Sequence, residues 1–220
     1  MANLPFSNIF YRKTRTGIGI LSVAIEVALV VVVVGLVHGT MNEYADRIKN
    51  VGADILFQGP DSSPFFALNS GVMPIQLTEK LGEVAGVDTV APVLLGRITN
   101  LKGINKLVTI FGVDSASYNR VGNGIQIIEG RGLEEPNDIV VDTVLSEADD
   151  VNVGDTLTIM NRDFTVSGVC RAGAGARLFI DIQVMGEGTA QPNKSSFFFL
   201  ETDSGTDIGE VAARLENRFE

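Results

Sequence analysis

An apolar block near the N-terminus constrains this chain more than any other feature. The 21 residues from Gly17 to Val37 include eight Val, three Ile, three Leu and a single charged residue, Glu26. As a helix at ~1.5 Å per residue the block spans roughly 32 Å, which matches a hydrocarbon core of about 30 Å. The fourteen large aliphatic side chains outweigh the insertion cost of one carboxylate. We therefore predict a transmembrane helix over residues 17–38.

Two other structures use apolar blocks, and neither fits well here. A secretory signal peptide has a shorter apolar core and a small-residue cleavage site, whereas this block is long and is followed by His38-Gly39-Thr40-Met41. A helix buried in a soluble domain is disfavoured because it would need a face polar enough to meet water, and no face of the block is.

The charges that flank the span predict its orientation. Three basic residues precede it and four charges that balance follow it: Arg12, Lys13 and Arg15, then Glu43, Asp46, Arg47 and Lys49. The positive-inside rule places residues 1–16 in the cytoplasm, at or near the membrane surface, and residues 41–220 outside. The chain carries −10 and residues 1–40 carry three positive charges and one negative, so the remainder carries −12. This charge suits a soluble external domain and argues against a nucleic-acid partner.

The predicted span also carries residues that a simple lipid anchor does not need. Gly19, Ser22 and Glu26 are spaced by three and four positions, so they share one helix face. Small residues allow helices to approach closely, and ionisable residues in a span normally face protein or water. We expect these three residues to pack against other transmembrane helices, supplied by self-association, by another subunit or by further spans.

The remaining residues predict an α+β domain built from two modules. The first is expected to contain a strand, a loop, a helix and two further strands at 51–58, 59–73, 74–85, 87–101 and 106–113. The second begins with a turn at Gly130-Arg131-Gly132, and a turn at Gly154-Asp155 opens its hairpin. A strand at 139–142 and a short helix at 144–149 come next. A hairpin follows, with strands at 156–160 and 164–170 joined by a turn at 161–163, and the module ends with a strand at 177–185. A loop, a strand and a terminal helix follow at 186–194, 195–201 and 207–219.

The residue types needed for common catalytic and metal sites are scarce. The chain has one Cys and one His, Cys170 and His38, which excludes a Cys/His zinc site within one chain and makes a Ser-His-Asp or Cys-His site improbable. The Walker pattern for phosphate binding is absent. We predict no catalytic, metal-binding or cofactor-binding residue, and we expect Cys170 to be a small core residue and Asp155 to cap its own turn.

The order of several motifs resembles a known family. After Arg15-Thr-Gly17 and the span, the chain reads Val51-Gly-Ala-Asp54, and the motifs that follow are Ile128-Glu-Gly-Arg-Gly132, Asp138-Ile-Val-Val-Asp142, Val153-Gly-Asp-Thr-Leu157 and Phe164-Thr-Val-Ser-Gly168. This ordered set resembles the first span and periplasmic core domain of the MacB/FtsX-type ABC transporter permeases.

The resemblance implies an architecture and a function beyond what the residue patterns predict. It implies a two-lobed external domain, with a β-α-β lobe at 41–118 and 193–220 and an inserted β-rich lobe at 119–192. It implies a dimeric permease that works with a separate or fused ABC ATPase. Such a permease drives efflux of toxins, peptides, lipids or lipoproteins, or signals to cell-wall hydrolases, and its external lobes are expected to contact a cargo or a periplasmic adaptor. Three further spans of such permeases are not in this sequence. The alternative is a single-pass anchored binding or scaffold module that works without an ATPase.

Overall fold

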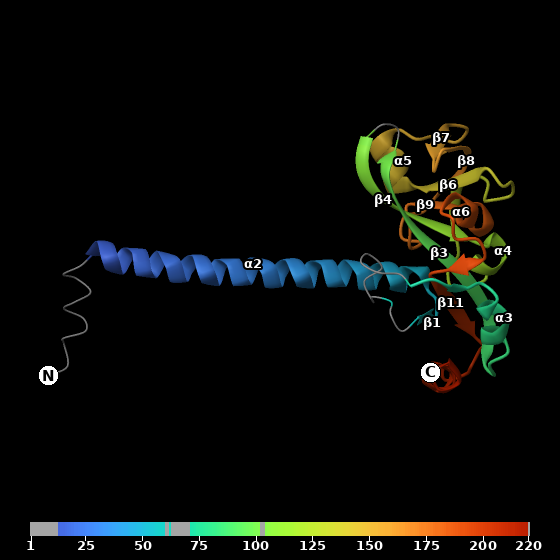
Figure 1. Ribbon diagram of the computed structural model, residues 1–220, viewed down its shortest axis with the longest axis horizontal. Helices are drawn as coiled ribbons and strands as arrows, with labels where there is room; N and C mark the ends of the chain where they lie inside the picture. The colour runs from blue at the N-terminus through green and yellow to red at the C-terminus, as the bar shows by residue number, and fades with distance from the viewer. Residues whose placement is uncertain (1–12, 60–61, 63–70, 102–103, 220) are drawn as a thin grey trace. The chain divides into compact units, whose positions relative to one another are not determined.

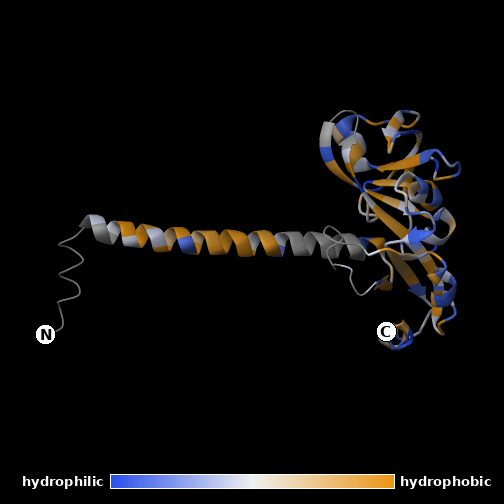
Figure 2. Ribbon diagram, viewed as in Figure 1, coloured by the Kyte–Doolittle hydropathy of each residue, from blue (hydrophilic) through white to orange (hydrophobic). Residues whose placement is uncertain are grey.

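The computed structural model describes residues 13–59, 62, 71–101 and 104–219, and it divides the chain into two compact units that meet between Asp46 and Arg47. The first unit contains most of one long helix, α2 (Lys13–Val51). Within it, Gly17–Gly39 is long and apolar enough to cross a membrane, and none of its most apolar window is buried. Figure 2 shows this stretch as a largely apolar segment of the helix. The predicted span is therefore present as a continuous, unburied helix.

Helix α2 continues well past the predicted end of the span. Its last residue is Val51, and Gly52 follows with φ = +80°, the left-handed conformation that commonly ends helices. The expected strand over 51–58 is therefore wrong in its first residues, because β1 begins at Ile55 (Ile55–Gln58).

The second unit is organised around one mixed sheet (Figure 1). Among the described residues nine strands form this sheet in the order β1-β11-β3-β4-β9-β6-β8-β5, with β7 paired to β8. Their bounds are β3 (Val87–Leu101), β4 (Ile104–Val113), β5 (Ile127–Gly130), β6 (Asp138–Asp142), β7 (Thr156–Ile159), β8 (Arg162–Cys170), β9 (Leu178–Asp181) and β11 (Phe197–Thr202). The pairs β4–β9 and β6–β8 are parallel and the others are antiparallel.

In the described part of this unit, a small two-stranded ribbon and five helices complete the fold. The ribbon pairs β2 (Met73–Pro74) with β10 (Lys194–Ser195). The helices are α3 (Leu77–Gly82), α4 (Ser115–Tyr118), α5 (Thr143–Asp149), α6 (Ile182–Gly188) and α7 (Ile208–Phe219). The α+β class is confirmed, and so are the strand pair β3–β4, helix α5 and helix α7. The predicted helix over 74–85 is shorter than expected, because Pro74 belongs to β2.

Apolar side chains cover both faces of the sheet, and β11 shows how the sequence distributes them. Phe197 and Phe199 point into a core cluster that also contains Val51, Phe111 and Phe179. Phe198 and Leu200 point to the opposite face, where α3, the turn that follows it and α7 cover them with Leu81, Val84, Val211 and Leu215. Alternation along a strand sends successive side chains to opposite faces. The expectation that Phe197 and Phe199 are core residues on one face is confirmed.

Residues 182–185 were expected to continue a strand, and this prediction is wrong. Asp181 instead begins helix α6, because its carboxylate accepts hydrogen bonds from the main-chain N–H groups of Gln183 and Val184. The helix packs over two strand glycines: a Cβ at Gly112 would lie 2.8 Å from Met185 Cβ, and one at Gly96 would collide with Met185 Cε. Because Gly96 and Gly112 have no side chains, the sheet leaves the space that this helix occupies.

The hairpin between β7 and β8 turns earlier than the sequence pattern indicated. Met160 and Asn161 both adopt positive φ, +52° and +60°, as expected at the centre of a type I′ turn. Arg162 already belongs to β8 and pairs with Ile159. The turn predicted over residues 161–163 is therefore displaced toward the N-terminus.

The sheet crosses the predicted boundary between the two lobes. Strand β4, from the first module, pairs in parallel with β9, from the second, through partners such as Phe111 and Phe179. Residues from both modules share one core cluster with these rings. The division into a lobe at 41–118 and 193–220 and an inserted lobe at 119–192 stays a prediction about architecture, and one sheet connects the two parts.

Candidate functional site

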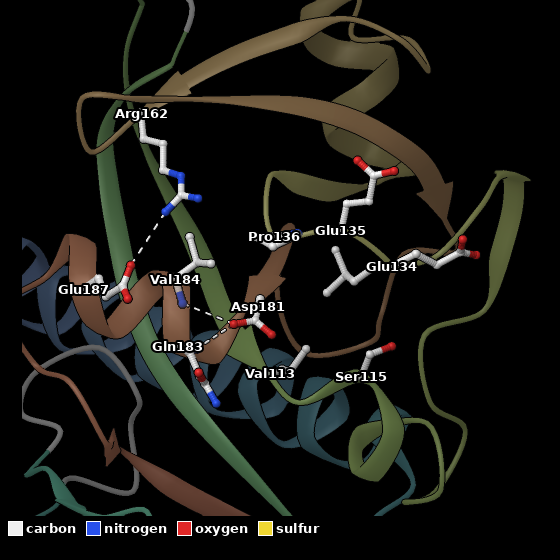
Figure 3. Close-up of a pocket in the computed structure, with 11 residues that line it drawn as sticks. Val113, Ser115, Glu134, Glu135, Pro136, Arg162, Asp181, Gln183, Val184 and Glu187 are labelled. Atoms are coloured by element: carbon white, nitrogen blue, oxygen red, sulfur yellow. Dashed lines mark hydrogen bonds and ion pairs between the residues drawn. The ribbon is translucent and has the colours of Figure 1, made fainter.

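A cleft with acidic walls lies beside helix α6, with a volume of about 420 Å³ (Figure 3). Its walls come from the end of β4, the start of α4, the loop before β6, strand β8 and helix α6. The residues that line it are Val113, Ser115, Leu133, Glu134, Glu135, Pro136, Arg162, Asp181, Gln183, Val184 and Glu187. The lining contains four carboxylates and one guanidinium, so its formal charge is negative.

Arg162 is the basic side chain among the lining residues, and three neighbours fix it in place. Its Nε donates to Asn137 Oδ1 over 2.8 Å, and its guanidinium lies 5.8 Å from the centre of the Phe164 ring. Its Nη1 approaches Glu187 Oε2 to 3.8 Å across the opening (Figure 3). Arg162 neutralises part of the charge of the cleft. Arg131, 3.8 Å from Glu134 and 3.9 Å from Glu135, neutralises a further part.

The predicted turn residue Arg131 has a larger role than a turn requires. Its Nη1 and Nη2 donate to the two carboxylate oxygens of Asp138, the second over 2.9 Å. The main-chain N–H groups of Glu134 and Glu135 donate to Asp138 Oδ2 over 2.9 and 2.8 Å. Four donors therefore converge on one carboxylate and fix the loop that forms one wall of the cleft.

The electrostatics of this cluster follow from burial and hydrogen bonding together. The Asp138 side chain is only 3% exposed, and that burial alone would raise its pKa. The hydrogen bonds from Arg131, Glu135 and Glu134, with the charge of Arg131, outweigh burial and hold the pKa of Asp138 below its ordinary value. The carboxylate hydrogen bond likewise raises the pKa of Arg131. Asp138 is thus ionised and paired at neutral pH.

Of the other predicted turn residues, Gly130 ends strand β5 and pairs with Gly168 of β8, whereas Gly154 and Asp155 precede β7. Gly130 has φ = +75°, and a Cβ there would collide with the carbonyl oxygen of Ser167 on β8. Gly154 has φ = +93° in open space. Asp155 Oδ2 accepts from the main-chain N–H of Asn152 over 3.0 Å, as a residue that closes its own turn does. These positions shape loops of the domain, and they do not gather into one site.

A second buried ion pair was not predicted from the sequence. Asp142 is 1% exposed, accepts from Arg177 Nη1 over 2.5 Å, and caps helix α5 by accepting from the main-chain N–H of Leu145. The signal was available in part: an Asp between an apolar strand and a helical segment is typical of a helix N-cap. The partner Arg177 is far along the chain, so only the fold identifies it.

The predicted helix-packing residues Gly19, Ser22 and Glu26 are all exposed on α2. A Cβ at Gly19 would meet nothing within 4 Å. Their contact with further helices stays a prediction.

Cys170 is a buried free cysteine, as expected, and burial with the nearby Asp142 charge raises its pKa to about 12. No group of three His, Cys, Asp or Glu side chains that could hold a metal ion occurs in the described part of the chain.

The fold is similar to those of solved extracellular and periplasmic domains of ABC-type transporters. The extracellular domain of the ABC-type transporter YknZ from Gram-positive bacteria superposes with a TM-score of 0.56 at 20% identity, covering 74% of this chain and 91% of that one. The periplasmic region of MacB from Actinobacillus actinomycetemcomitans gives 0.57 at 14% identity, covering 80% and 89%. These likenesses establish a shared fold.

Sequence comparison identifies the family directly. No curated protein matches the chain significantly. The sequence model of the family described as "MacB-like periplasmic core domain" matches residues 16–218, nearly the whole sequence. The resemblance seen in the ordered motifs is thereby confirmed, and the chain belongs to the MacB-like periplasmic core domain family.

Proposed function

We propose that this chain is a membrane permease component of an ABC-type export or mechanotransmission system. In this proposal a partner ATPase hydrolyses ATP on the cytoplasmic side, and the external domain moves in response and acts on a cargo or a periplasmic adaptor. The observation that carries the proposal is the family match, which begins at residue 16 and so includes the apolar helix together with the external domain. The N-terminus is cytoplasmic in this scheme and residues 41–220 are periplasmic or extracellular.

The end of helix α2 supports the proposal because it is built into the external domain. Val51 is 2% exposed, and its carbonyl oxygen accepts from the main-chain N–H of Asn123 over 2.9 Å. The Asn123 side chain donates to the Asn50 carbonyl over 3.1 Å. A Cβ at Gly122 would collide with the Val51 carbonyl, so the loop lies directly against the helix end. In this proposal, movement of the last residues of α2, Asn50 and Val51, is passed to the sheet through these packed, hydrogen-bonded contacts.

The acidic cleft is the surface that we assign to cargo or adaptor contact. Its carboxylates would pair with basic groups of the partner, and such charge complementarity acts mainly on specificity and association rate. Because exposed ion pairs are screened by salt, the contact should weaken as ionic strength rises.

The test compares two variants of the full chain in detergent. Val51→Asp places a charge in the buried junction, whereas Val144→Asp places the same charge at a side chain that is 47% exposed. We expect a P-loop ATPase to co-purify with the wild-type chain and with both variants, identified by mass spectrometry. Its ATP turnover should depend on the chain, and Val51→Asp alone should abolish that dependence.

Two outcomes would contradict the proposal. A chain that purifies from its native membrane with no ATPase supports the alternative of an anchored scaffold. An ATPase whose turnover is equally insensitive to both variants would remove the coupling role. Circular dichroism of both variants controls for unfolding of the external domain.

A further inference from the structure

A second pocket lies on the external domain at the end of helix α2; two of its lining residues, Asn50 and Asn123, belong to the junction described above, but the proposed function assigns no ligand to it. Its volume is about 250 Å³. The end of α2, the segment before β5 and the loop after β8 form its walls, and its lining residues are Asn50, Asn123, Gly124, Gln126, Arg171, Ala172, Gly173 and Ala174. We propose that this pocket binds a phosphate group.

The hydrogen bonds between its walls make the pocket a defined site. Asn123 joins the segment before β5 to the end of α2 through its main-chain and side-chain N–H groups. The main-chain N–H of Arg171 donates to the carbonyl of Gln126 over 2.8 Å. The hydroxyl of the buried Tyr118 donates to the Ala174 carbonyl over 2.6 Å and fixes the glycine-containing loop from within. Three segments distant in sequence thus hold the lining together.

Arg171 differs from the other arginines of the domain. Each of the others whose side chain is described takes part in an ion pair, a hydrogen bond or an electrostatic contact: Arg97, Arg120, Arg131, Arg162, Arg177, Arg214 and Arg218. Within the described ranges, no ion pair or side-chain hydrogen bond engages the guanidinium of Arg171. In a chain with a net charge of −10, a guanidinium without a carboxylate partner is an available anion-binding group.

The rest of the lining fits the same chemistry. It contains no carboxylate, and its other polar side chains are the amides of Asn50, Asn123 and Gln126, which all carry N–H donors. A carboxylate ligand offers two oxygens to a guanidinium, whereas a phosphate offers three or four and can also reach amide donors on other walls. Four donor side chains from three segments therefore favour phosphate. The phosphate is either free or part of a lipid headgroup, and both sources share this recognition.

The experiment uses the full chain and inorganic phosphate as the probe. The detergent-solubilised protein is titrated with phosphate at constant ionic strength, and the melting temperature and binding heat are measured. Wild type is compared with Arg171→Gln and with Lys194→Gln, which removes one positive charge away from the pocket. We expect Arg171→Gln to weaken phosphate binding by about tenfold or more, as loss of a charged hydrogen-bond donor implies, and Lys194→Gln to bind like wild type.

A second arm distinguishes the two sources of phosphate. The same three proteins are placed in nanodiscs of phosphatidylcholine alone or with phosphatidylglycerol. A rise in melting temperature with phosphatidylglycerol that Arg171→Gln alone loses, without a response to inorganic phosphate, assigns the site to a lipid headgroup. The proposal is overturned if neither probe separates Arg171→Gln from Lys194→Gln. Because no ATPase is involved, its failure leaves the proposed function untouched.

Discussion

Replacing Asp138 by Asn should destabilise the external domain strongly, although the side-chain shape is nearly preserved. The carboxylate is 3% exposed and accepts from both terminal nitrogens of Arg131 and from two main-chain N–H groups. An amide has one acceptor oxygen, so its NH₂ group must face a donor. Removing one partner of a buried pair costs about 3–5 kcal/mol. Arg131 is 39% exposed and can turn to water, so we expect the lower figure, about 3 kcal/mol.

Thermal unfolding of the full chain in detergent measures this cost. For a domain of this size each kcal/mol moves the Tm by about 2–4 °C, so Asp138→Asn should lower the Tm by about 6–12 °C at pH 7. The matched control is Glu135→Gln, which removes an exposed carboxylate 3.9 Å from the same guanidinium and should change stability by less than about 1 kcal/mol. Equal Tm values for the two variants would refute the reasoning.

The pH dependence supplies an independent check. Because the folded-state pKa of Asp138 is depressed, its contribution is fully present above the unfolded value of about 3.9. The contribution is lost as the pH falls through the lower, folded-state pKa. The Tm difference between wild type and Asp138→Asn should therefore be constant near neutrality and shrink below about pH 4. A difference that grows on acidification would contradict the assignment.

Three further predictions address the loop geometry, the orientation and the span. Gly130→Ala should cost about 2 kcal/mol or more by denaturant unfolding, because the residue adopts positive φ against a carbonyl, whereas Gly132→Ala, in open space, should stay within about 0.5 kcal/mol. A thiol placed at the exposed Ser204 should react with an impermeant maleimide on intact cells, while Cys170, with its pKa raised to about 12, should react only after unfolding; labelling of residue 204 only after lysis would reverse the orientation. Glu26→Leu should change cross-linking between spans in bilayers, and unchanged association would remove the helix-packing argument.

Local sequence signals predicted much of the fold. The hairpin of β3 and β4 and helix α5 have apolar patterns and turn or cap residues that lie next to each other in the chain. Helix α6 was missed because Ile182 and Val184 alternate like a strand and its glycines disfavour a helix. What decides its structure is the cap from Asp181 and the space above Gly96 and Gly112, and the space is a tertiary property.

The candidate sites show the same limit. The sequence indicated a turn at Gly130 and Arg131, whereas the structure places Gly130, with its left-handed backbone, at the end of strand β5. The sequence did not identify Asp138 as the ionic partner of Arg131, because Asp138 is the first residue of β6 and only the fold of the intervening loop brings the two side chains together. The acidic cleft could not be predicted from the sequence. Glu134, Arg162 and Glu187 come from three segments of the chain that are brought to one cleft only by the tertiary fold.

The position of β11 has a consequence for how the domain is synthesised. This strand lies between β1 and β3, yet it leaves the ribosome about 140 residues after β1 and about 100 residues after β3. Until residues 197–202 emerge, both neighbours keep open hydrogen-bonding edges, and such edges invite pairing with other chains. Long-range pairing of this kind also slows folding. Nascent or truncated chains that end before Phe197 should therefore aggregate or require a chaperone, even though most of the domain's residues have already been made.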